Sequence, residues 1–339
     1  MTQHDTATLC ARARAIVDAE AAIYAARRPR SRAIFADQGP GFYHQVPQHW
    51  MRDWPMPFPF AVAAASGSTL TDVDGNTLVD FCLGDTGAMF GHAPQPIVAA
   101  LAKSAERGLT TMLPSAEAAS VGQLLTDRFG PFVFQIATTA SDANRFAIRV
   151  ARAVTGRKKV LVFDGCYHGA VDETLVDCED GQTVARRNLR GQAVDVTTTS
   201  VSIPFNDPDA LHAALAGEEI AVVLAEPVMT NCGMILPDAG FLDTLRAATR
   251  ATGTLLHIDE THTIYSGLGG YTALHGLDPD IVVVGKPVGG GEPVAIWGMS
   301  QDVARRISAI RATRPGSAIP ASAPPCRAAR CRSPACRPA

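Results

Sequence analysis

The sequence lacks the features that mark several specialised classes of protein. Neither sign of charge dominates, because 33 Asp and Glu residues stand against 30 Lys and Arg residues, for a net charge of −3. That balance argues against a general attraction to nucleic acid or to an anionic membrane. No apolar run reaches the roughly 18 residues that a membrane-spanning helix needs. Residues 1–30 mix acids with bases and hold no apolar core, so we expect no secretory signal.

Cysteine patterns typical of metal sites are also scarce. The chain has eight Cys residues, and five of them are scattered, with no Cys-x-x-Cys pair and no His at zinc-finger spacing. Such residues in a reducing compartment are mostly thiols that pack as small hydrophobes. We therefore expect a soluble, cytoplasmic enzyme without a bound metal.

The hydrophobic content is that of a globular protein. The 339 residues are 47% hydrophobic and 19% charged, which suffices for one large core with a smaller domain beside it. An amphipathic helix is predicted from Asp5 to Arg28, and Asp74-Gly75-Asn76 between two alternating runs predicts a hairpin. We predict three parts: a helix and small segment over 1–75, a large domain over 76–311 and a tail over 312–339.

From Pro94 onward, helical patterns alternate with short apolar runs. The helical stretches are 96–107, 142–154 and 240–252, and the apolar runs are 160–163, 220–225, 254–258 and 281–284. Continuous apolar runs are typical of strands covered on both faces, and their alternation with helices indicates parallel strands joined by crossover helices. The predicted fold class is α/β, with a mixed or mostly parallel sheet flanked by helices.

The last 25 residues, 315–339, do not continue this pattern. They contain six Pro, seven Ala, four Arg and three Cys, with no acidic or aromatic residue. Such a segment buries too little apolar surface to offset its ordering entropy. Its Cys-x4-Cys-x4-Cys spacing also lacks a fourth zinc ligand nearby. We interpret it as a disordered or out-of-frame tail rather than a zinc site.

Three groups that could bind a ligand or take part in catalysis stand beyond the carboxyl ends of predicted strands, where an open α/β sheet binds ligands. Asp259 ends one apolar run, Lys286 ends another, and the small residues 138–142 precede a predicted helix. Partial desolvation favours the neutral, nucleophilic form of a lysine. A helix N-terminus offers backbone N–H groups to a phosphate.

Together, a nucleophilic lysine, a carboxylate and a phosphate-binding turn suit pyridoxal phosphate. Each group alone has a simpler interpretation. Asp259 could cap a helix or form a salt bridge, and Lys286 could be a solvated loop residue. Ser141 could cap the helix that follows it.

The sequence resembles the class III, fold-type-I pyridoxal-phosphate aminotransferases, particularly the branch that includes glutamate-1-semialdehyde aminomutase. The resemblance runs from about Leu70 to about Arg306. Its motifs, in the family's order, are Asp72–Asn76, Gly91-His92, Ala143–Gly156, Phe163–Gly169, Ala225–Val228, Ile258–Glu260 and Gly285–Gly291. The resemblance implies a fold-type-I large domain that binds pyridoxal 5'-phosphate, a small N-terminal α+β segment and a homodimer.

The resemblance also implies roles for individual residues. Lys286 matches the lysine that forms the Schiff base with the cofactor, and Asp259 matches the partner of the pyridine nitrogen. Tyr167 matches the aromatic residue that stacks on one face of the ring. Thr261 stands in place of the usual valine on the other face.

Further matches surround the cofactor less directly. Ala140 and Ser141 correspond to the Gly-Thr pair of the phosphate loop, and Glu226 to the family's Glu-Pro motif. His262 stands near the ring hydroxyl, where relatives carry Gln or Met. Tyr167 and His262 could instead be packing residues, and Glu226 could be a structural ion-pair partner.

The substrate pocket is expected to draw on the first part of the chain. Its candidate residues are Trp50, Trp54, Asp85 and Thr86. Relatives continue beyond the lysine region into a C-terminal domain, whereas here the match dissolves after Ile307. We interpret that departure as a truncated or frameshifted C-terminus.

The implied reaction is transfer of an amino group from an amino acid or amine to a keto acid or aldehyde. Lys286 would be the general base, and Asp259 would keep the ring nitrogen protonated. A 2,1-aminomutase and an amino-acid epimerase use the same groups without an external keto acid. An inactive, truncated cofactor-binding fragment is a further alternative. We expect neither a nucleic-acid partner nor a membrane.

Overall fold

The chain forms two compact units that divide between Arg107 and Gly108 in a computed structural model, which describes residues 3–36 and 41–313. The boundary predicted at residue 75 falls inside a hairpin, and the first unit runs further because that hairpin and the helix after it belong to it. Apart from residues 312 and 313, the predicted tail lies outside the described residues.

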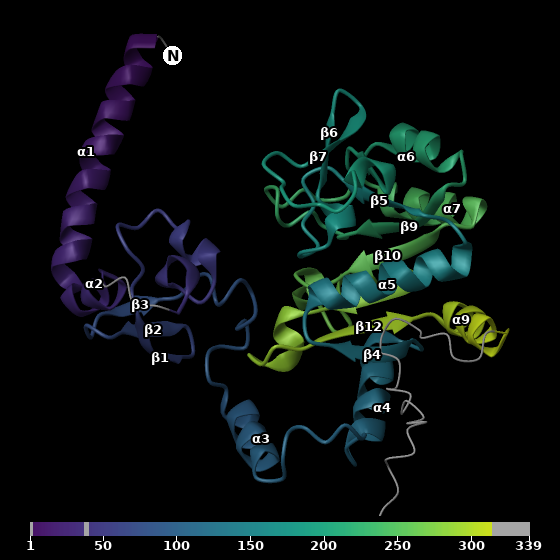
Figure 1. Cartoon of the computed structure of the whole chain (residues 1–339), viewed down its shortest axis with the longest axis horizontal. Helices are drawn as coiled ribbons and strands as arrows, with labels where there is room; N and C mark the ends of the chain where they lie inside the picture. Colours follow the sequence, from purple (N-terminus) through teal and green to yellow (C-terminus); the bar gives the residue numbers. More distant parts are fainter. Residues whose placement is uncertain (1–2, 37–40, 314–339) are drawn as a thin grey trace, which may run out of the picture. The chain divides into compact units, whose positions relative to one another are not determined.

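The first unit combines helices with a small antiparallel sheet in the order β1-β2-β3 (Figure 1). Its elements are α1 (Gln3–Arg27), α2 (Pro29–Ala36), η1 (Tyr43–Gln45), η2 (His49–Arg52), β1 (Val62–Ser66), β2 (Thr69–Asp72), β3 (Thr77–Val79) and α3 (Gln95–Ala105). The predicted hairpin is confirmed. Its turn is closed by Asp72, whose carboxylate accepts the N–H groups of Asp74 at 3.0 Å and Asn76 at 2.8 Å.

The second unit is built on a seven-stranded sheet in the order β4-β12-β11-β10-β9-β5-β8. Its strands are β4 (Val133–Ala137), β5 (Lys159–Phe163), β8 (Ser200–Ile203), β9 (Ile220–Ala225), β10 (Leu255–Asp259), β11 (Ile281–Val284) and β12 (Ala295–Met299). The five strands from β11 to β8 run parallel, and β12 runs antiparallel between β11 and β4. The predicted α/β class with a mostly parallel sheet is confirmed.

Helices and short turns connect these strands. They are α4 (Ala118–Phe129), α5 (Ala140–Thr155), η3 (Asp172–Thr174), η4 (Val196–Thr198), α6 (Pro208–Leu215), α7 (Phe241–Thr252), η5 (Thr263–Ser266), α8 (Gly270–Leu274), η6 (Lys286–Gly289) and α9 (Gln301–Thr313), with the hairpin β6 (Val176–Glu179) and β7 (Gln182–Ala185). Helix α5 crosses the sheet in front of its middle strands (Figure 1) and contacts β9, β11 and β12. The N-terminal part of this helix lies at the edge of the sheet where the parallel strands end.

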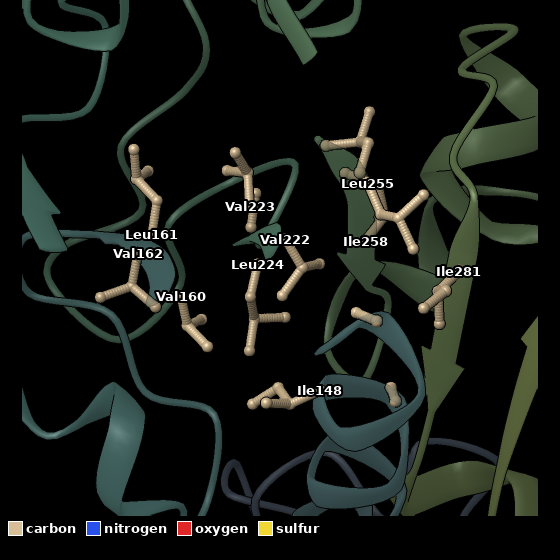
Figure 2. Close-up of a cluster of buried hydrophobic side chains, with 14 of the residues drawn as sticks. Ile148, Val160, Leu161, Val162, Val222, Val223, Leu224, Leu255, Ile258 and Ile281 are labelled. Atoms are coloured by element: carbon tan, nitrogen blue, oxygen red, sulfur yellow. The ribbon is translucent and has the colours of Figure 1, made fainter. Parts of the chain in front are cut away.

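The core of the second unit lies between α5 and the strands. Val160 of β5 and Val222 and Leu224 of β9 lie on the side of the sheet that faces Ile148 of α5 (Figure 2). Leu161 lies on the opposite side, as the alternation of side chains along a strand requires. Each such side chain stabilises the fold by about 1.5–3 kcal/mol when fully buried. The packed core therefore fixes the positions of the strand ends.

The described residues contain no helix with both the length and the apolar content needed to cross a bilayer. Within the same part of the chain, no group of three or more His, Cys, Asp or Glu side chains is arranged to hold a metal ion.

Candidate active site

Several of the predicted site residues meet at the carboxyl edge of the parallel strands. Asp259 is the last residue of β10, Glu226 follows β9 directly, and Lys286 follows β11 after a single glycine. Because β9, β10 and β11 are adjacent and parallel, their ends lie next to one another at the same edge. The fold therefore brings together groups that are 60 residues apart in sequence.

The Asp259 carboxylate is the centre of a buried hydrogen-bond cluster. Its Oδ2 lies 2.9 Å from Nδ1 of His168 and accepts a bond from Nδ2 of Asn144 at 3.0 Å. Its Oδ1 accepts the N–H of Thr261 at 3.0 Å. Asn144 also donates to the backbone oxygen of His168 at 3.1 Å, which ties α5 to the loop after β5. Three separate segments thus fix the orientation of one carboxylate.

The charge state of this cluster follows from its contacts. Burial by itself would raise the pKa of Asp259, but the hydrogen bond and charge of His168, with the bonds from Thr261 and Asn144, lower it below its usual value. Burial would also lower the pKa of His168, but the bond to Asp259 outweighs it and raises that pKa. The pair is therefore an Asp259 carboxylate facing a protonated His168. Asp259 does form a salt bridge, as one interpretation of the sequence predicts, and its partner is His168.

The start of α5 is shaped by two hydroxyl groups. Thr139 is the N-cap, because its hydroxyl accepts the N–H of Asp142 at 3.1 Å, so the interpretation of Ser141 as the cap is wrong. Ser141 instead accepts the N–H of Ala170 at 3.0 Å. The first-turn N–H groups of a helix have no intrahelical acceptor and form a site for anions. Ala140 and Ser141 lie in that turn.

Gly169 makes the contact between this helix and the loop after β5 possible. Its φ is +82°, and a Cβ added there would lie 2.0 Å from Oγ of Ser141. Only glycine meets both conditions, since other residues adopt that backbone conformation at a cost and would clash with the hydroxyl. The loop that carries Tyr167 and His168 is thereby held against the N-terminus of α5.

The turn after β11 sets the position of Lys286. Gly285 packs so closely against Ala140 that an added Cβ would lie 2.8 Å from the Ala140 side chain and 3.4 Å from Thr261. Lys286 itself has a φ of +46°, which is unusual for a residue with a side chain. Its Nζ lies 2.8 Å from Nε2 of His262 in a half-buried setting. The lysine is therefore not a solvated loop residue.

The remaining predicted residues of this unit have distinct surroundings. Thr261 is buried, and its Oγ1 has no hydrogen-bond partner within the described structure. Glu226 is also buried and accepts bonds from the hydroxyl of Thr230 at 2.5 Å and its N–H at 3.2 Å. Tyr167 is 51% exposed, so the interpretation as a packing residue is wrong for it.

The four candidate substrate residues lie in the first unit. Trp50 and Trp54 are both exposed, and Asp85 and Thr86 have left-handed backbone conformations, with φ of +54° and +67°. Because Lys286 belongs to the second unit, a role for these four residues in the same pocket stays a prediction.

Two residues of the cluster escaped the sequence analysis, namely His168 and Asn144. Both lie inside motifs that carry the family resemblance, His168 next to Tyr167 and Asn144 three positions after Ser141. The available signal for Asn144 was a polar residue near the start of the helix that follows the predicted phosphate loop, since a polar group that becomes buried there needs a partner.

Comparisons with known proteins show the family to which the chain belongs. The sequence profile of the family described as Aminotransferase class-III matches residues 51–316. A glutamate-1-semialdehyde 2,1-aminomutase from Akkermansia muciniphila is 36% identical over 259 residues, which cover 74% of this chain and 60% of that protein. The chain therefore spans about three fifths of the length of such curated relatives.

Solved structures of an aminomutase and a transaminase have a similar fold. A glutamate-1-semialdehyde aminomutase from Pseudomonas aeruginosa PAO1 is 45% identical, with a TM-score of 0.88 over 91% of this chain and 69% of that one. A lysine-to-alanine variant of an aminomutase from that strain was solved in complex with PMP. An omega-transaminase from Sphaerobacter thermophilus is 30% identical, with a TM-score of 0.76 over 81% of this chain and 65% of that one.

Proposed function

The chain belongs to the class III aminotransferase family, and we propose that it is a pyridoxal-phosphate enzyme that moves an amino group between an amine donor and a keto or aldehyde acceptor. The observation that carries the proposal is the half-buried Lys286 one glycine beyond the end of β11, on the strand next to β10, where Asp259 is held as a carboxylate. A lysine amine and a buried carboxylate on adjacent strands are the two groups that this cofactor needs most.

The residues present fit the cofactor. A carboxylate that stays ionised when buried suits a protonated ring nitrogen, and Asp259 meets that condition through His168 and Asn144. The N-terminus of α5 suits a phosphate dianion. Within the described residues the buried hydroxyl of Thr261 has no hydrogen-bond partner, and the ring of Tyr167 is exposed, so both groups are available to a bound cofactor.

Each residue has a defined task in this proposal. Pyridoxal phosphate, when bound, supplies an aldehyde carbon for amines and a ring that withdraws electrons from a neighbouring C–H bond. Lys286 would hold the cofactor covalently and, once released, accept and return a substrate proton at Nζ. Asp259 would hold a proton on the ring nitrogen opposite it. His168 and Asn144 would keep that carboxylate oriented, while Ala140 and Ser141 would bind the phosphate.

An intramolecular 2,1-aminomutase is the second candidate function. It is supported by the relatives, because the aminomutase from Pseudomonas aeruginosa PAO1 is 45% identical to this chain and the omega-transaminase from Sphaerobacter thermophilus is 30% identical. An amino-acid epimerase would use the same groups. An inactive fragment is the competing proposal, given that the chain spans 60% of the length of the Akkermansia muciniphila relative.

One experiment separates these candidates. The full chain is loaded with pyridoxal phosphate and given a panel of amine donors, with and without an added keto acid, and the products are identified by NMR. A transaminase converts the donor catalytically only when the keto acid is present. Rearranged or racemised product without a keto acid favours the aminomutase or the epimerase. No conversion of any donor by chain that carries the cofactor contradicts an active enzyme.

We also propose a homodimer in the cytoplasm. The cytoplasmic location is supported by the five cysteines of the described residues, all of which are free thiols, as in a reducing compartment. Exposed apolar side chains in the loops of the second unit, including Leu236 and Leu268, support an interface with a second copy.

A further inference from the structure

Thr261 carries a hydroxyl that the surrounding protein leaves unpaired. The residue is 8% exposed, its Oγ1 is buried, and that atom has no hydrogen-bond partner within the described residues. The N–H of the same residue is bonded to Oδ1 of Asp259 at 3.0 Å. A buried hydroxyl without a partner destabilises a fold, and a valine of nearly the same shape would avoid that cost.

The unpaired hydroxyl lies where three segments of the site meet. Oγ1 and the methyl carbon of Thr261 are each 3.4 Å from the position that a Cβ on Gly285 would occupy, and the Cβ of Ala140 is 2.8 Å from the same position. Gly285 directly precedes Lys286, and Ala140 is the first residue of α5. Thr261 is therefore packed between the turn after β11 and the N-terminus of α5.

The N-terminus of α5 has backbone donors that the helix itself does not use. The N–H groups of Asp142 and Ala143 are bonded to the hydroxyl and the carbonyl of Thr139. The N–H groups of Ala140 and Ser141 form no hydrogen bond within the part of the chain that the structure describes. Such first-turn donors bind anions. A phosphate dianion has more lone pairs than two N–H groups satisfy, so it also accepts a neighbouring O–H donor.

We propose that Thr261 is a phosphate-binding residue, whose hydroxyl donates to an oxygen of the cofactor phosphate held at the N-terminus of α5. This inference rests on the proposed function. Rotation about χ1 exchanges the hydroxyl with the methyl group while the backbone stays in place, so the donor can turn towards a ligand. The phosphate then supplies the acceptor that the chain lacks. The valine usual at this position in the family has no such donor.

Thr272 of α8 provides a matched control. It is 7% exposed, and its Oγ1 likewise has no partner in the residues that the structure describes. Its N–H donates at 2.5 Å to the carboxylate of Glu260, whereas the preceding residue, Asp259, is bonded to Asn144 of α5. Successive side chains of an extended segment point to opposite sides. Thr272 therefore belongs to the side of the sheet away from α5.

Urea denaturation of the full chain without cofactor is the first test. Thr261→Val and Thr272→Val each replace an unpaired hydroxyl by a methyl group of similar size, so both should unfold at a higher urea concentration than the wild type. A lower midpoint for Thr261→Val contradicts the proposal, because it shows that the hydroxyl already has a partner in the chain without cofactor.

Isothermal titration calorimetry is the second test, with pyridoxamine 5'-phosphate and pyridoxamine as ligands. Neither ligand has an aldehyde, so neither forms a covalent bond with a lysine. Thr261→Val should bind pyridoxamine 5'-phosphate about tenfold more weakly than the wild type, as expected for one lost hydrogen bond to a charged group, and should bind pyridoxamine equally well. Thr261→Ser, which keeps the hydroxyl, and Thr272→Val should both stay near wild type.

Three binding results overturn the proposal. Equal affinities of the wild type and Thr261→Val for pyridoxamine 5'-phosphate show that the hydroxyl does not bind the phosphate. An equal loss for both ligands shows that the side chain acts on the ring instead. An equal loss in Thr261→Val and Thr261→Ser shows that the shape of the side chain matters and not its hydroxyl. Failure of the proposed function is distinguishable, because the wild-type chain would then bind neither ligand, which contradicts both proposals.

Discussion

His257 shows how burial sets the charge of a residue. It lies in the middle of β10, fully buried, and neither ring nitrogen has a hydrogen-bond partner in the described part of the chain. Burial lowers the pKa of His257 to about 3, despite the opposing charge of Asp259. The ring is therefore neutral in the folded protein. In the unfolded chain it takes up a proton near its ordinary value of about 6.5.

This difference predicts a loss of stability in mild acid. Below pH 6.5 the unfolded state binds one more proton than the folded state at this residue, so stability falls as the pH drops towards 3. Between pH 6.5 and pH 5 the contribution is about 2 kcal/mol. In urea denaturation, the free energy of unfolding of His257→Leu should therefore fall by about 2 kcal/mol less than that of the wild type between pH 6.5 and pH 5.

The control for this prediction is His212→Leu, at an exposed position of α6. It should leave the pH dependence of the wild type unchanged. An unchanged dependence in His257→Leu as well would show that His257 is not forced to be neutral. The His168–Asp259 pair does not interfere, because raising the pKa of His168 affects stability above pH 6.5, and lowering that of Asp259 affects it below about pH 3.9.

At the residue scale, the sequence predicts the reactive groups better than the groups that support them. Lys286 and Asp259 can be found because each ends an apolar run, and strand ends are where this fold class binds ligands. Asn144 and His168 reach Asp259 from 115 and 91 residues away. No local pattern encodes such a contact, because it depends on how α5 and the loop after β5 pack against the sheet.

At the scale of elements, the strands that were missed differ from those that were found. The runs of β9, β10 and β11 are continuous and fully buried, which makes them visible in the sequence. Strand β4 contains Gln135 and is partly exposed, and β12 is interrupted by Gly298. An added Cβ at Gly298 would lie 2.8 Å from Phe132 and Phe134, so this glycine serves packing between strands rather than a turn.

The junction between α5 and the loop after β5 gives the next prediction. Gly169→Ala places a Cβ on the hydroxyl of Ser141 in addition to straining a left-handed backbone. Gly181→Ala, in the turn between β6 and β7, has a similar φ of +75° but open space around the added carbon. Gly169→Ala should therefore destabilise the chain by about 1–3 kcal/mol more than its control in urea denaturation.

The same pair of variants should differ in cofactor binding. Gly169→Ala displaces Ser141 and the first turn of α5, so it should weaken binding of pyridoxal phosphate much more than Gly181→Ala does. Equal stability and equal affinity in the two variants would show that the Ser141–Ala170 contact does not shape the phosphate site.

At the scale of the whole molecule, the family matches most of this chain, while the chain covers part of its relatives. The match extends over residues 51–316, and the chain spans 60% and 62% of the length of two curated aminomutases. The sheet that carries Lys286 and Asp259 lies within the matched part. Cofactor binding by this chain therefore tests the proposed function more directly than turnover does.

Assembly is the second property at this scale. Met234, Leu236 and Leu268 expose large apolar side chains in loops after β9 and η5, and burying them in a second copy would remove that surface from water. Analytical ultracentrifugation should give twice the monomer mass of 35.7 kDa. Leu268→Asp should shift the equilibrium towards monomer. A wild-type chain that stays monomeric at all concentrations contradicts the proposed homodimer.

The central claim is that Lys286 binds pyridoxal phosphate covalently at the edge of the sheet. Its most direct test is an absorbance titration of the full chain with pyridoxal phosphate, beside a Lys286→Ala control. We predict a visible band that saturates at one cofactor per chain and is absent from the control. A folded wild-type chain without such a band, or the same band in Lys286→Ala, would contradict the account.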